Sequence, residues 1–160
     1  MLKIFGCCAI IMACTAFGVE HGNEVSKHRK ALEELHKIFT LFQLEVQFTK
    51  IPVREVFIKL LSKADPPYKS WMEDIDHIGN FEEDWSKLID THFQESHLTK
   101  EEKNELKALG KNLGCSEAIS LYLSSLELSI QNTREEEKEK KKLYQSMGVM
   151  GGIFLVILLL

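Results

Sequence analysis

Residues 99–130 read TKEEKNELKALGKNLGCSEAISLYLSSLELSI, and this stretch indicates two helices joined by a short turn. Thr99 and Glu102 have the spacing of a capping box, in which a hydroxyl and a carboxylate each accept a hydrogen bond from a backbone N–H at a helix start. Apolar residues then recur at spacings of three and four, at Leu106, Leu109 and Leu113 and at Ile119, Leu123, Leu126 and Ile130. We expect Gly114 to end the first helix in a left-handed conformation and Ser116 to cap the second.

The same helical spacing extends toward the N-terminus. Apolar stripes of this kind occupy residues 24–50, 53–61, 67–75 and 85–93. They are separated by strong breakers, at Pro52, at Asp65-Pro66-Pro67 and at Gly79-Asn80. No strand-like alternation of useful length occurs. The sequence therefore predicts an all-α fold in which residues 21–131 form a bundle of five or six helices, with Trp71 and Trp85 in its core.

A charged run follows the last stripe. Residues 132–142 read NTREEEKEKKK, and Glu136–Lys140 and Glu137–Lys141 are i,i+4 pairs in the favourable order. No helix breaker precedes Gly148, so we expect the last helix to continue as a charged stalk.

Both ends of the chain are apolar. Residues 147–160 contain no polar side chain, and residues 4–19 contain no charge. A membrane-spanning helix needs about 20 apolar residues. The sequence predicts an N-terminal transmembrane anchor at residues 1–20 and a C-terminal transmembrane helix at residues 143–160. Gly148 and Gly152 have the small-xxx-small spacing that permits close packing of helices in lipid, within one chain or between copies.

The N-terminal segment has three interpretations. It is a cleaved signal peptide, a lipoprotein signal with Cys14 at the end of a loose lipobox, or an uncleaved anchor. Basic residues lie on the inner side of both apolar ends, at Lys27, Arg29 and Lys30 and at Lys138, Lys140, Lys141 and Lys142. Because cytoplasmic flanks are rich in lysine and arginine, this pattern favours the anchor and a cytoplasmic middle domain. The single thiol of that domain, Cys115, agrees with a reducing compartment.

No catalytic chemistry is evident in the sequence. The formal net charge of −4 has the wrong sign for a nucleic-acid-binding surface. Glu33-x-x-His36 and Asp74-x-x-His77 have the spacing found in di-iron bundles, but those sites also need two carboxylates on facing helices. We therefore predict no enzyme activity, no metal and no cofactor.

Three stretches together resemble the stage III sporulation protein AB family of spore-forming bacteria, and the resemblance covers nearly the whole chain. These are a leucine–glutamate pair ahead of a proline (Leu44, Glu45, Pro52), a doubled Leu-Gly (Leu109, Gly110, Leu113, Gly114), and a charged stalk before a glycine-bearing terminal segment. We interpret the two glycines as structural, Gly110 for close packing and Gly114 for helix termination. Glu117 and Leu121 depart from the pattern, which is expected to have Asp and Gln there.

The resemblance implies a non-enzymatic platform in the mother-cell membrane that faces the forespore. Its soluble domain would lie in the cytoplasm and be similar to the cytoplasmic domain of the type II secretion inner-membrane platform protein. The expected partners are the cytosolic ATPase stage III sporulation protein AA, other stage III sporulation membrane proteins, membrane lipid and, in a homo-oligomer, further copies of the chain. Two alternatives are a membrane-anchored helical enzyme or metalloprotein, and an exported lipoprotein with a helical sensor domain.

Overall fold

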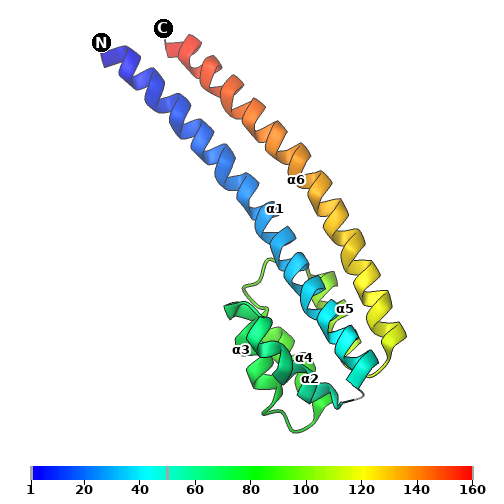
Figure 1. Ribbon diagram of the computed structural model, residues 1–160. Helices are drawn as coiled ribbons and strands as arrows, with labels where there is room; N and C mark the ends of the chain where they lie inside the picture. The colour runs from blue at the N-terminus through cyan, green and yellow to red at the C-terminus, as the bar shows by residue number, and fades with distance from the viewer. Residues whose placement is uncertain (1, 50, 160) are drawn as a thin grey trace. The chain divides into compact units, whose positions relative to one another are not determined.

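The computed structural model describes the backbone of residues 2–49 and 51–159. Side chains are described from Glu24 to Leu143, except at positions 50, 67 and 82, and beyond that at positions 146, 147, 150, 151, 154 and 157. Every regular element in these residues is a helix, which confirms the all-α prediction (Figure 1). The elements are α1 (Leu2–Thr49), α2 (Val53–Leu60), the 3₁₀ helix η1 (Leu61–Lys63), α3 (Pro66–Ile75), α4 (Phe81–His92), α5 (Lys100–Gly110) and α6 (Ser116–Leu159).

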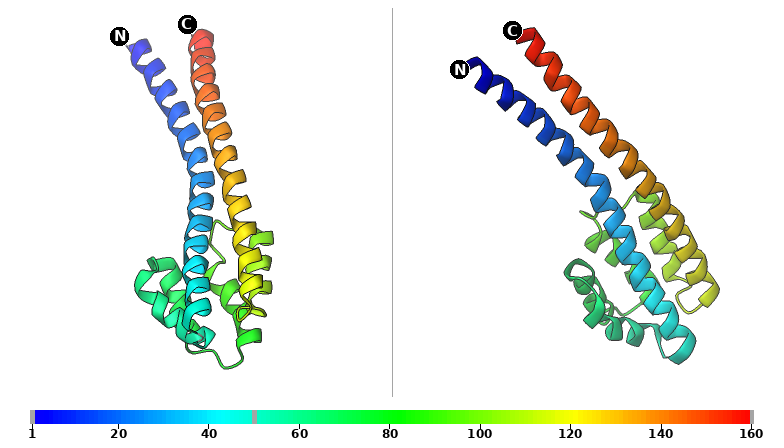
Figure 2. Two further views of the ribbon diagram at one scale, coloured as in Figure 1. Left: turned by 45° about the vertical axis from the view of Figure 1, so that its right-hand side comes forward. Right: turned by 45° about the horizontal axis from the view of Figure 1, so that its top comes forward.

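The chain divides into two compact units. Residues Lys30–Ile130 form the first, here called the helical unit, and Met1–Arg29 with Gln131–Leu160 form the second, here called the terminal unit. Helices α1 and α6 each contribute residues to both units. Within the terminal unit the two helices run alongside each other, with the N- and C-terminal ends at the same end of the unit (Figures 1 and 2).

Aromatic side chains fill the centre of the helical unit. The ring centroids of Trp71 in α3 and Trp85 in α4 are 5.4 Å apart, and Phe57 of α2 lies 5.6 Å from Trp71. Phe39 of α1 lies 6.4 Å from Trp71, and Tyr122 of α6 lies 5.1 Å from Phe39. Rings from α1, α2, α3, α4 and α6 thus share one core, and both tryptophans are buried in it as predicted. Burying each such side chain contributes about 1.5–3 kcal/mol.

The turn between α5 and α6 is only partly as predicted. The capping box at the start of α5 is present: the Thr99 hydroxyl accepts from the Glu102 N–H, and the Glu102 carboxylate accepts from the Thr99 N–H at 2.8 Å. Helix α5 ends at Gly110, about one turn before Leu113, the last residue of its apolar stripe. The next residue, Lys111, keeps right-handed backbone angles (φ −71°, ψ −20°).

Two local predictions in this turn are wrong. Gly114 does not have the positive φ of a left-handed cap, and α5 has already ended at Gly110, with Lys111 in a right-handed conformation. Ser116 does not cap α6: the Cys115 carbonyl accepts the first helical hydrogen bond, from the Ile119 N–H at 3.2 Å. The Ser116 hydroxyl accepts from Gln47 Nε2 at 3.0 Å and so joins α6 to α1.

Helix α6 runs without a break over its 44 residues, which confirms the predicted continuation of the last helix through the charged run. At about 1.5 Å per residue it is about 66 Å long. Glu136 forms an ion pair with Lys140, as predicted. The charged run is therefore helical over its whole length.

Among the described residues, no helix has a stretch long and apolar enough to cross a membrane. The predicted anchor at residues 1–20 lies outside the described side chains, as do most positions of the predicted transmembrane helix at residues 143–160. Both membrane segments therefore stay predictions.

Candidate interaction surface

Helices α4 and α5 are in close contact. The buried indole of Trp85 donates from Nε1 to the Leu106 carbonyl at 3.0 Å. A Cβ added to Gly110 would lie 2.1 Å from Cδ1 of the same indole, far inside van der Waals contact. Leu109 and Leu113 are buried in the core, whereas Gly114 is exposed and has no atom within 4 Å of an added Cβ. The first glycine of the doubled Leu-Gly thus lies at a helix contact and the second in an open turn.

The side chains of the leucine–glutamate pair, Leu44 and Glu45, differ in their contacts: Glu45 is ion-paired and Leu44 is exposed. The Glu45 carboxylate accepts from Lys59 Nζ at 3.2 Å, which joins α1 to α2. The Pro52 carbonyl accepts from the Val56 N–H at 3.2 Å and begins α2. Leu44, by contrast, is 45% exposed, so it contributes little to the core. Glu45 and Pro52 shape the α1–α2 corner, while Leu44 is free for contact with another molecule.

Two apolar stripes are exposed on the helical unit. The first, here called the α1 stripe, consists of Leu44 and Phe48, of which Phe48 is 80% exposed. The second, here called the α6 stripe, consists of Leu121 and Leu128, which are 73% and 60% exposed. Apolar residues gathered on an exposed surface are typical of interaction sites. We did not predict either stripe, although the seven-residue spacing of Leu121 and Leu128, away from the core positions of the same helix, was a readable signal.

Charged side chains of opposite sign flank the two stripes. Lys37 lies seven residues before Leu44, on the same face of α1, and is exposed. Glu117 and Glu127 are exposed beside the α6 stripe. Lys37 is paired with Glu34 on the same helix at 3.1 Å, so the α1 stripe has neighbours of both signs, whereas those of the α6 stripe are acidic.

An ion pair ties α1 to α6 in the terminal unit. Arg29 Nε donates to Glu137 Oε2 at 2.7 Å, although the two residues are 108 positions apart. Both side chains are largely covered, with 22% and 17% of their surfaces exposed. The hydrogen bond from Arg29 is the main reason why the pKa of Glu137 is lowered. Glu137 is predicted to pair with Lys141; its hydrogen bond goes to Arg29, and the nearby charge of Lys141 also lowers the pKa of Glu137, but less.

A model of the stage III sporulation protein AB family matches residues 3–160. The chain belongs to the stage III sporulation protein AB family. A curated relative, stage III sporulation protein AB of Bacillus subtilis (strain 168), is 22% identical over 171 aligned positions, which cover 100% of both chains. No solved structure matches the chain. Membership of this family assigns the chain a role in sporulation.

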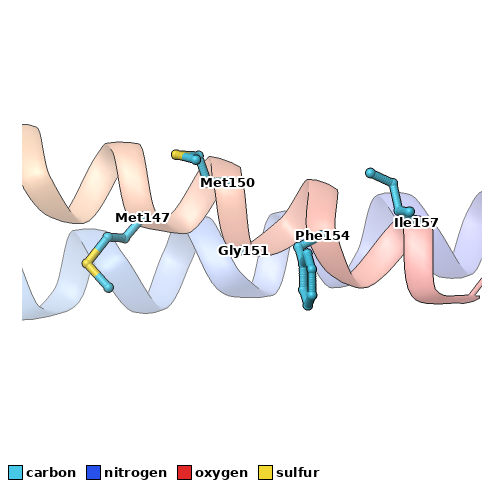
Figure 3. Close-up of a pocket in the computed structure, with 5 residues that line it drawn as sticks. All are labelled: Met147, Met150, Gly151, Phe154 and Ile157. Carbon is cyan, nitrogen blue, oxygen red and sulfur yellow. The ribbon is translucent and has the colours of Figure 1, made fainter.

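A third exposed apolar surface lies on α6, in the terminal unit. Met147, Met150, Gly151, Phe154 and Ile157 line a pocket there (Figure 3). Figure 3 shows Met147 and Phe154 pointing to one side of the helix and Met150 and Ile157 to the other. All four of these large side chains are exposed. Gly148 and Gly152, where we predicted close helix packing, lie outside the described side chains.

Two polar contacts of the described residues involve groups that can bind metal ions. Among the side chains that the structure describes, no three His, Cys, Asp or Glu residues come together in a way that could hold a metal ion. Asp74 is 2.7 Å from His92 Nε2. The exposed thiol of Cys115 donates to the Glu117 carboxylate at 3.2 Å, and this bond is the main cause of the lowered pKa of Glu117.

Proposed function

We propose that the chain is a non-enzymatic membrane platform of the stage III sporulation apparatus. Its apolar ends anchor it in the mother-cell membrane that faces the forespore, and its helical unit lies in the cytoplasm. There it docks the secretion-type ATPase stage III sporulation protein AA, next to other stage III membrane proteins. Family membership supports the sporulation role, and the arrangement of the two ends supports the platform.

The observation that carries the proposal is the Arg29–Glu137 pair. It holds α1 and α6 together just before each helix enters its apolar end. Two helices joined at this level are suited to enter the same face of one bilayer. The basic residues around them, including Lys27 and Lys141, have the distribution of a cytoplasmic flank. A folded unit between two such helices presents its surface to cytosolic proteins.

Co-purification tests the proposal. The full chain and a variant that keeps only residues 1–23 and 143–160 are each extracted in mild detergent with the tagged ATPase. We expect the full chain to retain the ATPase and the shortened variant to lose it. Equal retention by both would place the contact in the membrane segments and remove the docking role of the helical unit.

The metalloprotein alternative has its own measurement. Metal analysis of the purified full chain should find iron and zinc well below one ion per chain. A stoichiometric metal that survives dialysis against a chelator would favour that alternative over the platform.

A further inference from the structure

We propose that the α6 stripe is the docking site for a basic amphipathic helix of a partner protein. Leu121 and Leu128 are largely exposed, and they lie on one face of α6, about 10 Å apart along its axis. A partner helix with apolar residues at the same spacing can place one residue on each leucine. The inference goes beyond the proposed function, because it concerns the chemistry of the partner and does not require the ATPase.

The α6 stripe lies on the outer side of its helix. At 3.6 residues per turn, Leu126, which is buried in the core, lies nearly half a turn around α6 from both leucines. On one edge of the stripe, the Ser125 hydroxyl donates to the Glu105 carboxylate of α5 at 2.8 Å. The exposed side chain of Glu127 lies on the other edge. Carboxylates therefore lie on both sides of the two leucines.

The carboxylates around the α6 stripe are not neutralised within the described part of the chain. Glu117, one turn before Leu121, accepts a hydrogen bond from the Cys115 thiol at 3.2 Å. Among the described residues, none of Glu105, Glu117 and Glu127 forms an ion pair. Residues 112–133 contain no lysine, arginine or histidine that could offer one. The negative charge of this surface is therefore available to a partner.

The lysines of α5 do not supply the missing cation. Lys107 forms an ion pair with Asp90 of α4, and Lys103 Nζ donates to a backbone carbonyl that follows α4 in the chain, at 3.5 Å. Lys100 is the first residue of α5, and Lys111 comes directly after its last residue. The basic side chains of α5 thus contact the α4 side or lie at the ends of the helix.

Charge complementarity identifies the occupant as a basic segment. A helix whose apolar face is flanked by lysine and arginine would place its apolar residues on the two leucines and its cations beside the carboxylates. An anionic lipid surface carries charge of the same sign as these carboxylates, so it would be repelled. An acidic protein segment would be repelled for the same reason.

Site-specific photocrosslinking in sporulating cells tests the inference. The full chain carries a benzophenone amino acid in place of Leu121, which lies outside the core, and the crosslinked segment is identified by mass spectrometry. We expect a segment of another protein that has net positive charge and apolar residues at helical spacing. An acidic segment, a second copy of the chain, lipid alone, or no product at either Leu121 or Leu128 would each overturn the inference.

Charge reversal adds a second readout. Glu127→Lys should lower the crosslinking yield at Leu121 at least about fivefold, because the basic partner then meets a like charge. Glu73→Lys, at an exposed position of α3, is the matched control and should leave the yield unchanged. Replacing the basic residue of the partner segment nearest to the crosslink by glutamate should restore the yield. An unchanged yield in Glu127→Lys would contradict the role of charge and overturn the inference.

The co-purification with the ATPase gives an independent result. If Leu121 captures a basic helix of a protein other than the ATPase, the inference is supported and the ATPase does not dock through the α6 stripe. If the full chain retains the ATPase while Leu121 captures an acidic segment, the proposed function stands and the inference alone is wrong.

Discussion

At Gly110 the helix contact depends on the absence of a side chain. An added Cβ would lie 2.1 Å from Cδ1 and 2.4 Å from Nε1 of Trp85, and the indole is held by its hydrogen bond to Leu106. Because the ring is buried and cannot move aside, Gly110→Ala should lower the free energy of unfolding by about 1–3 kcal/mol. Denaturant unfolding of the full chain in detergent, followed by the fluorescence of its two tryptophans, measures this loss.

Gly114 provides the matched control. No atom lies within 4 Å of its added Cβ, and its φ is not positive. Gly114→Ala should therefore leave stability unchanged or raise it by about 0.4–1 kcal/mol, because alanine restricts the unfolded chain more than glycine does. Similar losses from both substitutions would contradict the close contact at Gly110.

The Tyr122 hydroxyl is a second residue-scale test. It is buried, and in the part of the chain that the structure describes it has no hydrogen-bond partner. Burial, and then the charge of Glu105, raise the pKa of Tyr122. Tyr122→Phe should keep the ring contact with Phe39 and raise the free energy of unfolding by about 1 kcal/mol, since an unsatisfied buried polar group is removed. A loss of stability in the same unfolding measurement would show that the hydroxyl is bonded.

The two ends of α5 show what could be predicted from the sequence and what could not. The capping box at Thr99 was predictable because it depends on four consecutive residues. The left-handed cap at Gly114 was a wrong prediction because α5 ends earlier, at the glycine that meets Trp85. That contact depends on where α4 lies in space, which the spacing of residues along α5 does not encode.

At the scale of elements, the ion pair between α1 and α6 can be measured with a double-mutant cycle. Arg29→Ala and Glu137→Gln are made singly and together, and unfolding is followed for each variant. We expect a coupling of about 1 kcal/mol near neutral pH, at the upper end of the range for exposed pairs because both side chains are largely covered. A pair of exposed residues, Lys87 and Asp84, is the control and should couple more weakly.

The same pair gives a pH dependence with a defined sign. Arg29 lowers the pKa of Glu137 in the folded state, so the folded chain favours the charged carboxylate. The coupling should therefore be complete above the ordinary carboxyl pKa of 4.5 and disappear as the pH falls through the lowered value. Repeating the cycle near pH 3 checks this. A coupling that grows on acidification would have the wrong sign for this ion pair.

Pairing between distant elements was not predictable from local spacing. The charged run predicted Glu136–Lys140 correctly because both residues lie on one helix turn. Glu137 was assigned to Lys141 by the same reasoning, but its partner Arg29 comes from a helix 108 residues away. The local rule gives a few tenths of a kcal/mol per pair, and Lys141 accordingly lowers the pKa of Glu137 less than the hydrogen bond from Arg29 does.

At the scale of the whole molecule, composition and periodicity were enough for the fold class, since apolar stripes and breakers define helices locally. They were not enough for the exposed stripes. Leu44 has the same chemistry as the core leucines, and only the packed structure distinguishes it, whereas the seven-residue spacing of Leu121 and Leu128 away from the core positions of α6 is visible in the sequence. The family resemblance to stage III sporulation protein AB was correct and rested on motifs that span the chain.

The orientation of the whole chain in the membrane can be tested at Cys115, which is exposed in the helical unit. The other three cysteines are replaced, so that Cys115 is the only thiol, and intact bacterial cells that express the chain are treated with a membrane-impermeant maleimide. We expect no labelling until the cells are opened, because the orientation proposed from the basic flanks places the unit in the cytoplasm. A Lys3→Cys variant without Cys115 is the matched control. Its thiol lies at the outer end of the predicted anchor, before the uncharged run of residues 4–19, and should be labelled in intact cells. Labelling of Cys115 before lysis, with Lys3→Cys protected, would reverse the orientation and with it the access of a cytosolic ATPase.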